Sequence, residues 1–464
     1  MPCCGPGYLN PSEATVRAPK ETVLFVTSPH ADGGNDMLVA VNVDSTSNDF
    51  CKIVSKIVFP NKGDEVHHTG WNACSSCYDK PDKKRSHLII PCLNSSRIYV
   101  VNVENEKNLI LEKTIEPSLL KGLNVSFPHT SHCLANGQIM ISTLGDADDN
   151  QSGNFLLLNG QTFDPVGTWT PNPVAFNYDF WYQPRHDVMI STEWGAPHKI
   201  KKCFNPADVA EGFYGHSIHV FQWSTHEKLQ TIELPMPNGA LPLEVRFKHE
   251  PSSPHAFVGT ALGSAVYHLE PEVVGSKKYK AVEVIKIPDK EVTGWALLSM
   301  PGLITDILIS MDDQFLFISC WLHGDIRQYD IRDPSKPVLV SSVFIGGSIH
   351  KESGVVVTKD SELQAQPDAL YVKNKKVEGG PQMLQLSLDG KRLYVTTSLY
   401  SIWDKQFYPK LSKTGAMLLQ IDVTDDGMKL NPNFLVDFST LEGGPYLAHE
   451  MRYPGGDCTS DIWV

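Results

Sequence analysis

ITDILISMDDQFLFISCWLHGDIRQYDI, residues 304–331, is the stretch that decides the fold. It contains three short apolar stretches, and the pair Asp312-Asp313 between the first two is a turn signal. The middle stretch, Leu316-Phe317-Ile318-Ser319, has three apolar residues followed by a small one. The last, Ile326 to Ile331, mixes apolar and polar residues before another Asp-containing turn. The pattern predicts consecutive antiparallel strands with the LFIS strand second.

The short middle strand recurs along the whole chain. Three apolar residues followed by a small residue or proline occur seven times, at residues 24–27, 88–91, 139–142, 188–191, 256–259, 316–319 and 393–396. A further strand pattern follows each copy, and a half-polar outer strand often follows that. Four short strands repeated seven times predict an all-β, seven-bladed β-propeller. A pair of β-sandwiches is the alternative, and the seven similar units favour the propeller.

The repeats also predict the domain organisation. Residues 1–22 precede the first repeat and are predicted to form an N-terminal tail, whereas residues 23–464 form a single propeller domain. The polar interval 346–379 before the seventh repeat is predicted to be an inserted surface loop. Helices are scarce, with short ones predicted at 117–122 and 205–211.

Composition narrows the function classes. The chain has 464 residues, 41% of them hydrophobic, and a formal net charge of −13. The electrostatic field of this net negative charge repels phosphate backbones, so nucleic acid is not an expected partner. The N-terminal MPCCGPG has neither the basic nor the apolar region of a signal peptide, and no apolar run has the length of a membrane span. We therefore expect a cytosolic protein whose ten cysteines are mostly reduced.

Polar residues precede the recurring strand in most repeats, where the innermost strand of a blade would line the central channel. They are His129, Asp179, Glu244, Asp306 and Gln382, with His67 and His68 in the second repeat. Channel positions are candidates for function because their side chains converge on one axis.

The first repeat lacks an innermost strand of its own, and the C-terminus can supply one. Residues 447–453 are available, so we predict a propeller closed by the C-terminal strand, which brings His449 beside His67, His68 and His129. Converging imidazoles suit copper or zinc. The alternative is that these histidines bond to water or to acids of the next blade. His132 is predicted to be structural or to orient a ligand.

Three cysteines are also candidates. Cys74 and Cys77 form a C-x-x-C, which can be a redox pair or half of a zinc site. Cys51 is placed on an outer strand, where a small buried apolar role is the commoner outcome. The chain has no GxGxxG, Walker, GxSxG or HExxH motif, so nucleotide, serine-hydrolase and zincin chemistry have no support.

Longer segments carry a family resemblance. HHTGWNACSSC at 67–77, FPHTSHCL at 127–134, YDFWYQPRHDVMISTEW at 178–194 and HEMRYPGGDCTSDIW at 449–463 resemble the selenium-binding protein 1 family, which includes the methanethiol oxidases. The resemblance runs over nearly the whole chain.

The resemblance implies a propeller fold and a copper-dependent oxidase that converts methanethiol, O2 and water to formaldehyde, hydrogen sulfide and hydrogen peroxide. It implies His67, His68, His129 and His449 as copper ligands and Cys51 as the selenium-associated cysteine. It also implies a cytosolic protein with some nuclear and peripheral-membrane association.

Two hypotheses follow. In the first, channel copper binds the thiol substrate and passes its electrons to O2, with Glu244 or Asp306 relaying protons. In the second, the protein is a selenium or thiol carrier using Cys51, and the propeller is a scaffold for protein partners without catalytic turnover.

Overall fold

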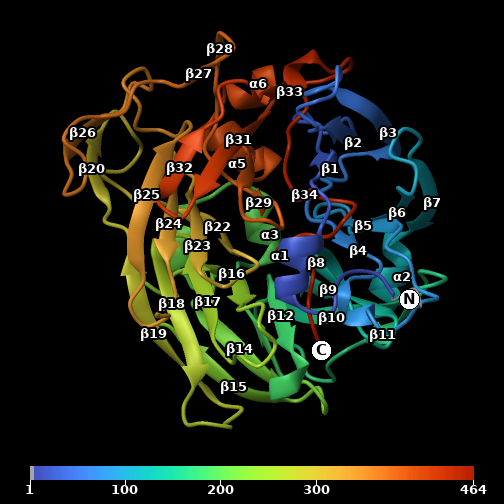
Figure 1. The fold of residues 1–464 in the computed structure, drawn as a ribbon. Coiled ribbons are helices and arrows are strands. Elements are labelled where there is room, and N and C mark those ends of the chain that lie inside the picture. Colours follow the sequence, from blue (N-terminus) through green and yellow to red (C-terminus); the bar gives the residue numbers. More distant parts are fainter. Residues whose placement is uncertain (1–4) are drawn as a thin grey trace.

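Seven antiparallel sheets dominate the computed structural model, which describes residues 5–464 (Figure 1). The first sheet comprises β34 (Met451–Arg452), β1 (Val23–Ser28), β2 (Asn35–Asn42) and β3 (Ile53–Lys62). The second comprises β4 (Gly70–Trp71), β5 (His87–Pro91), β6 (Ile98–Asn102) and β7 (Ile110–Ile115). The third comprises β8 (Ser126–Cys133), β9 (Gln138–Gly145), β10 (Gln151–Asn159) and β11 (Pro165–Thr168).

The remaining four sheets repeat this order. The fourth comprises β12 (Phe180–Gln183), β13 (Val188–Ser191), β14 (Ser217–Gln222) and β15 (Lys228–Glu233). The fifth comprises β16 (Pro242–Phe247), β17 (Ala256–Thr260), β18 (Ala265–Pro271) and β19 (Tyr279–Lys286). The sixth comprises β22 (Ile304–Ile309), β23 (Phe315–Cys320), β24 (Asp325–Asp330) and β25 (Val338–Phe344). The seventh comprises β29 (Leu384–Leu386), β30 (Arg392–Thr396), β31 (Met417–Thr424), β32 (Gly427–Leu430) and β33 (Val436–Asp437).

The predicted propeller-like, all-β class is confirmed, and the recurring strand is second in every sheet. Several first strands contact the first strand of a neighbouring sheet, as β16 does with both β12 and β22. The C-terminal strand β34 pairs with β1 through Val26 and Phe25. No sheet among residues 5–464 closes on itself, and closure of the ring by the C-terminal strand stays a prediction.

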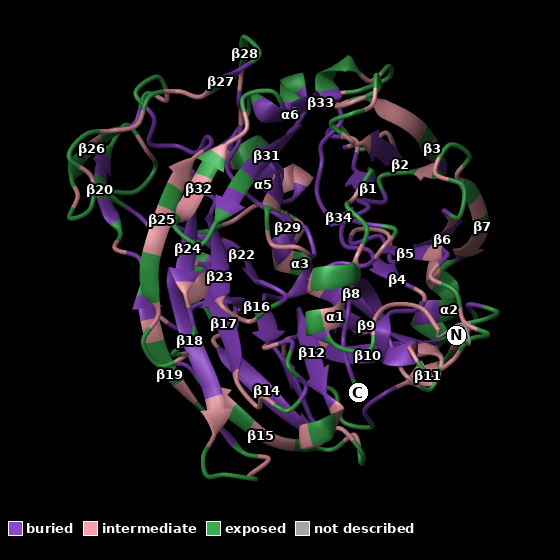
Figure 2. Cartoon of the chain, viewed as in Figure 1, coloured by how far each residue is buried: buried purple, intermediate pink, exposed green. Residues whose placement is uncertain are grey.

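Neighbouring sheets cover both faces of each second strand, which explains its unbroken apolar sequence. In β1, Leu24 and Val26 enter one buried cluster and Phe25 enters another, where it meets Trp71 of the second sheet edge to face. Outer strands such as β3 alternate between half-buried and exposed residues. Figure 2 shows this gradient from a buried interior to an exposed rim.

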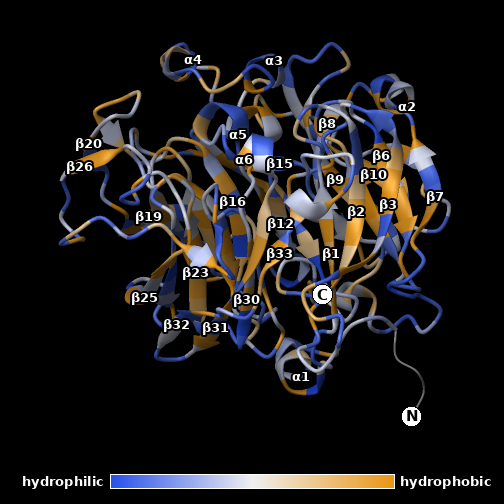
Figure 3. Cartoon of the chain, turned by 90° about the horizontal axis from the view of Figure 1, so that it is seen from above, coloured by the Kyte–Doolittle hydropathy of each residue, from blue (hydrophilic) through white to orange (hydrophobic). Residues whose placement is uncertain are grey.

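The helices lie in loops around the sheets. They are α1 (Pro11–Arg17), α2 (Pro117–Gly122), α3 (Pro197–Ile200), α4 (Pro206–Ala210), α5 (Ser401–Phe407) and α6 (Leu411–Thr414), with single 3-10 turns at Ser75–Cys77, Pro184–His186 and Phe438–Thr440. Viewed from above, α3 and α4 lie on one side of the molecule and α1 on the opposite side (Figure 3). Trp403 of α5 donates to the carbonyl of Ile200 in α3, so helices from two distant insertions pack together.

The interval 346–379 contains strands as well as loop. Its β26 (Val356–Lys359) pairs with β20 (Lys290–Thr293), which also pairs with β21 (Ser299–Met300). Its β27 (Tyr371–Val372) and β28 (Lys375–Lys376) form a hairpin. Part of the predicted tail is also structured, since Tyr8 donates to the carbonyl of Gly455 and α1 follows; residues 1–4 lie outside the described part.

Candidate metal centre

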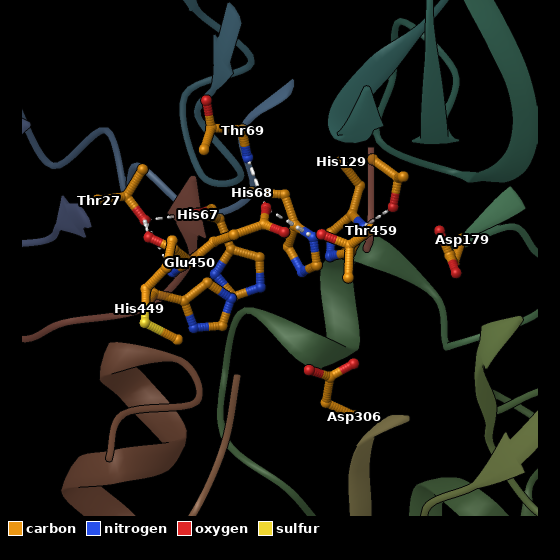
Figure 4. A network of polar contacts seen from close by, with 12 residues as sticks. Thr27, His67, His68, Thr69, His129, Asp179, Asp306, His449, Glu450 and Thr459 are labelled. Carbon is orange, nitrogen blue, oxygen red and sulfur yellow. Dashed lines mark hydrogen bonds and ion pairs between the residues drawn. The ribbon is translucent and has the colours of Figure 1, made fainter. Parts of the chain in front are cut away.

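Three separate segments bring four histidines together in the interior. His67 and His68 lie just before β4, His129 lies in β8, and His449 lies just before β34. Ring centroids are 3.8 Å apart for His67 and His449, 4.0 Å for His68 and His129, and 5.0 Å for His67 and His68. Each side chain is buried, with at most 3% exposed. Figure 4 shows the rings gathered in one place, as the sequence predicted.

The outer ring nitrogens of three of these histidines are held by the protein. Nδ1 of His449 is 3.0 Å from the carbonyl of Ser398, Nδ1 of His129 is 3.0 Å from Oγ1 of Thr130, and Nδ1 of His68 is 3.2 Å from a Glu450 carboxylate oxygen. These contacts fix each ring and leave its Nε2 free, as metal-binding histidines require.

The inner nitrogens have nothing to bond to. Nδ1 of His67 and Nε2 of His68, His129 and His449 are buried without a hydrogen-bond partner among the described residues. Such groups are costly unless something satisfies them. Burial lowers the pKa of all four rings, to about 4 for His449, and their mutual repulsion lowers that of His67, His68 and His129 further. The site therefore presents neutral imidazoles with free lone pairs, a donor set that fits a copper or zinc ion.

The donor atoms of His67, His68 and His449 lie within 4.8 Å of one another. His129 is joined to this trio through its ring contacts with His67, 5.2 Å, and His68. These three or four imidazoles would hold the ion.

Sequence reasoning missed Glu450, a buried carboxylate that contacts the histidine cluster. Its carboxylate contacts His68, accepts from the backbone N–H of Thr69 at 2.7 Å, and pairs with Arg452 at 2.5 Å. Its position immediately after His449 was the available signal, because a residue adjacent to a predicted ligand lies near the same site.

A buried network of three carboxylates and one arginine lies near the histidine cluster. Arg246 pairs with Asp179 at 2.6 Å and with Glu244 at 2.7 Å, and lies 3.6 Å from Asp306. Tyr178 is near both groups. Its ring lies 4.0 Å from that of His129, and burial, reinforced by the carboxylates of Glu244, Asp179 and Asp306, raises the pKa of its hydroxyl. Among the ion pairs of the described residues, the predicted relay residues Glu244 and Asp306 are joined to Arg246 and not to the clustered histidines.

One cation cannot neutralise three buried carboxylates, so protons are retained. Burial, reinforced by Asp179, raises the pKa of Glu244 well above its usual range. Burial also raises the pKa of Asp306 from 3.8 to about 7, against the opposing effect of Arg246. Near neutral pH the network therefore stores at least one exchangeable proton.

Asp306→Asn is expected to remove part of the pH dependence of stability. In the native protein this carboxyl keeps its proton up to about pH 7, whereas the unfolded chain releases it near pH 3.8. The free energy of unfolding therefore falls as pH rises through this window. Asparagine does not titrate and can still accept a hydrogen bond from the N–H of Leu384. The free energy of unfolding of the Asp306→Asn variant, relative to that of the native protein, should therefore rise with pH. Urea unfolding at several pH values tests this, and parallel pH profiles would contradict it.

Aromatic side chains wall the cluster on the side of α5. The Tyr400 ring lies 6.2 Å from that of His67, and Trp194 contacts Tyr178, Tyr400 and Trp403. Glu65, two residues before His67, accepts hydrogen bonds from the backbone and hydroxyl of Ser401 and so anchors α5 here. The arrangement shields the histidines from bulk water.

The cysteines differ from the sequence-based expectation. Cys74 pairs with Cys133 of β8 rather than with Cys77, which is a buried free thiol. No bond joins Cys74 and Cys77 here, and a redox role for this pair stays a prediction. A pairing between residues 59 positions apart depends on the contact of two sheets, which a local motif does not report.

Cys51 lies in the turn before β3, not on the outer strand, because its φ of 65° is incompatible with a strand. Its thiol is half-buried and lines a surface groove of about 600 Å³ with Leu435 and Asp437. Burial raises the pKa of this thiol. The groove contains none of the four clustered histidines.

His132 packs among aromatic rings instead of orienting a ligand. Its ring is 5.1 Å from those of both Phe180 and Trp181, and neither ring nitrogen has a hydrogen-bond partner within residues 5–464. The structural role predicted for it is the better description.

Comparison with known proteins places these features in context. The model of the 56-kDa selenium binding protein family matches residues 2–464. Methanethiol oxidases of Xenopus tropicalis and Homo sapiens are 53% and 52% identical over 470 aligned positions, covering 99% of this chain and 99% and 98% of theirs.

Solved structures agree with this family match. A hypothetical selenium-binding protein from Sulfolobus tokodaii has a TM-score of 0.86 and 33% identity, covering 98% of both chains. A periplasmic gluconolactonase of Pseudomonas aeruginosa, 10% identical with a TM-score of 0.54, covers 93% of this chain and 98% of its own, and shares the fold alone. In the described part of the chain, no helix has the length and apolar character needed to cross a membrane.

Proposed function

The chain belongs to the 56-kDa selenium-binding protein family, and from that membership we propose that it is a copper-dependent methanethiol oxidase. The proposed reaction converts methanethiol, O2 and water to formaldehyde, hydrogen sulfide and hydrogen peroxide. Carbon is oxidised by two electrons, O2 is reduced by the same two, and water supplies the oxygen of formaldehyde.

The observation that carries the proposal is the set of unpartnered imidazole nitrogens on His67, His68, His129 and His449. Hydrogen bonding within the described residues explains the outer nitrogens of these rings but not the facing ones, whereas the facing nitrogens match the preference of copper for imidazole. Copper held there would offer a coordination position to the substrate sulfur, which favours the thiolate, and would accept its electrons.

The surrounding residues hold the site and handle protons. Glu450 keeps His68 oriented through Nδ1, and Ser398 does the same for His449. Reduction of O2 to peroxide consumes two protons, and the protonated carboxyl groups near Tyr178 can exchange them. We assign Glu244 and Asp306 this relay role, supported by their raised pKa values.

The aromatic wall gives the site its selectivity. Tyr178, Trp194 and Tyr400 exclude bulk water and present apolar surface, which suits a substrate consisting of one methyl group and one sulfur.

The test is an aerobic assay of the purified protein, metal-free and copper-loaded, with methanethiol as substrate. We expect formaldehyde, sulfide and peroxide in equal amounts from the copper-loaded protein and no turnover without metal. Copper-loaded protein that binds one ion per chain and yields no sulfide would overturn the proposal and favour the carrier hypothesis.

Selenium is assigned to Cys51, because its thiol opens onto a groove and the family is selenium-binding. Cys51→Ser is expected to abolish selenium retention while oxidase turnover stays largely intact, since the groove and the histidine cluster share no residue. Bound selenium per chain and turnover are the two measurements. Cys203→Ser, which changes another half-buried free cysteine of the described residues, is the control.

Loss of turnover in folded, copper-replete Cys51→Ser protein would place this sulfur in the reaction. The same family relationship supports our proposals of a cytosolic location and of some nuclear and peripheral-membrane association.

A further inference from the structure

A second group of metal-ligating side chains lies in the fifth sheet, away from the central histidines. It consists of His255, His268 and Glu270. His268 and Glu270 alternate along β18 and so project from the same face. Ala256 of β17 pairs with Leu269, which brings the preceding residue, His255, alongside Glu270. The hairpin register therefore gathers all three.

The donor atoms are already close. Nδ1 of His255 is 2.9 Å from Nε2 of His268, and the carboxylate of Glu270 lies within 4.8 Å of both. Two nitrogens bound to one tetrahedral zinc ion at 2.0–2.1 Å are roughly 3.3 Å apart. A small separation of the two rings would admit an ion in place of the hydrogen bond between them.

The groups carry suitable charges. Burial lowers the pKa of His268 to about 4 and also lowers that of His255, so both rings are neutral near pH 7. Lys280 lowers the pKa of Glu270 and binds its Oε1 at 2.9 Å, which leaves the other carboxylate oxygen available. His268 is buried, whereas His255 and Glu270 are half-exposed, so an ion can enter from solvent and keep a water ligand.

We propose that His255, His268 and Glu270 form a second metal site that binds zinc. Two imidazoles and one glutamate are an established zinc donor set, with the fourth position open to water. Binding breaks the N–H···N hydrogen bond between the rings, and its proton moves through solvent to the other nitrogen of the same ring, so that both facing nitrogens offer lone pairs to the ion. The site shares no residue with the central cluster and is independent of the proposed oxidase function.

Zinc titration of the metal-free protein against a chelating indicator tests this site. Relative to the native protein, His268→Gln and His255→Gln should each bind about one zinc ion fewer per chain. Glu270→Gln should lower the affinity for that ion. Lys280→Met should raise it, because the ammonium that competes for the Glu270 carboxylate is removed. His198→Gln, which changes an exposed histidine elsewhere, is the matched control.

A purely structural histidine pair predicts a different outcome. In that case the native protein and all of these variants bind the same number of zinc ions with the same affinity, and the proposal is wrong. If His268→Gln fails to fold, the half-exposed His255→Gln and Lys280→Met variants decide the question. Methanethiol oxidation by the copper-loaded variants should be unchanged.

Discussion

Replacing His129 or His449 with alanine is expected to abolish methanethiol oxidation and to lower bound copper substantially. Each ring offers an Nε2 that has no other partner in the described structure, and each is oriented through Nδ1. Because the ligands come from three sheets, binding depends on preorganisation, and the loss of one ligand cannot be compensated by a mobile neighbour. Copper per chain and turnover are the measurements.

The fold should survive these substitutions. An unpartnered buried nitrogen is a cost to the metal-free protein, so its removal offsets part of the packing lost with the ring. Far-UV circular dichroism should therefore not change. His132→Ala, in the same strand as His129, is the matched control, and its effect on copper should be much smaller because it contacts Phe180 and Trp181 rather than the cluster. Full copper and full turnover in the His129 and His449 variants would remove the central site from the mechanism.

The repeating strands could be predicted from the sequence because their signal is local. A run such as Leu316-Phe317-Ile318 needs apolar residues on both faces once neighbouring sheets cover it, and this requirement is the same in all seven sheets. The innermost position then follows by counting backwards, which placed His129, Glu244 and Asp306 on strands β8, β16 and β22.

The contacts that complete the site depend on distant residues and were not predictable in this way. Glu450 meets His68 across 382 positions of sequence, and Arg246 meets Asp179 across 67. Neither partner carries a motif that names the other. Cys74 likewise resembled half of a local C-x-x-C, although its neighbour in space is Cys133.

Deleting the chain from Gly443 onward is expected to destabilise the whole fold. The deleted segment contains β34, whose flanking residues bond the first sheet: the N–H of His449 donates to Thr27 and the N–H of Thr27 donates to Glu450. It also reaches the second sheet through Arg452 and Thr69, and the seventh through Tyr453 and Gln385. Its loss leaves the inner edge of β1 unpaired and exposes apolar core.

Two comparisons separate the loss of this strand from the loss of a ligand. His449→Ala removes the ligand and keeps the strand, so it should unfold close to the native temperature, whereas the truncated chain should aggregate or unfold at a much lower one. A chain lacking Val464 alone should behave as the native protein does, because that side chain is 44% exposed. If the truncated chain is soluble, monomeric and as heat-stable as the full chain, the C-terminal strand does not close the propeller. A ring that depends on this strand would be destabilised by the loss of its contacts with the first, second and seventh sheets.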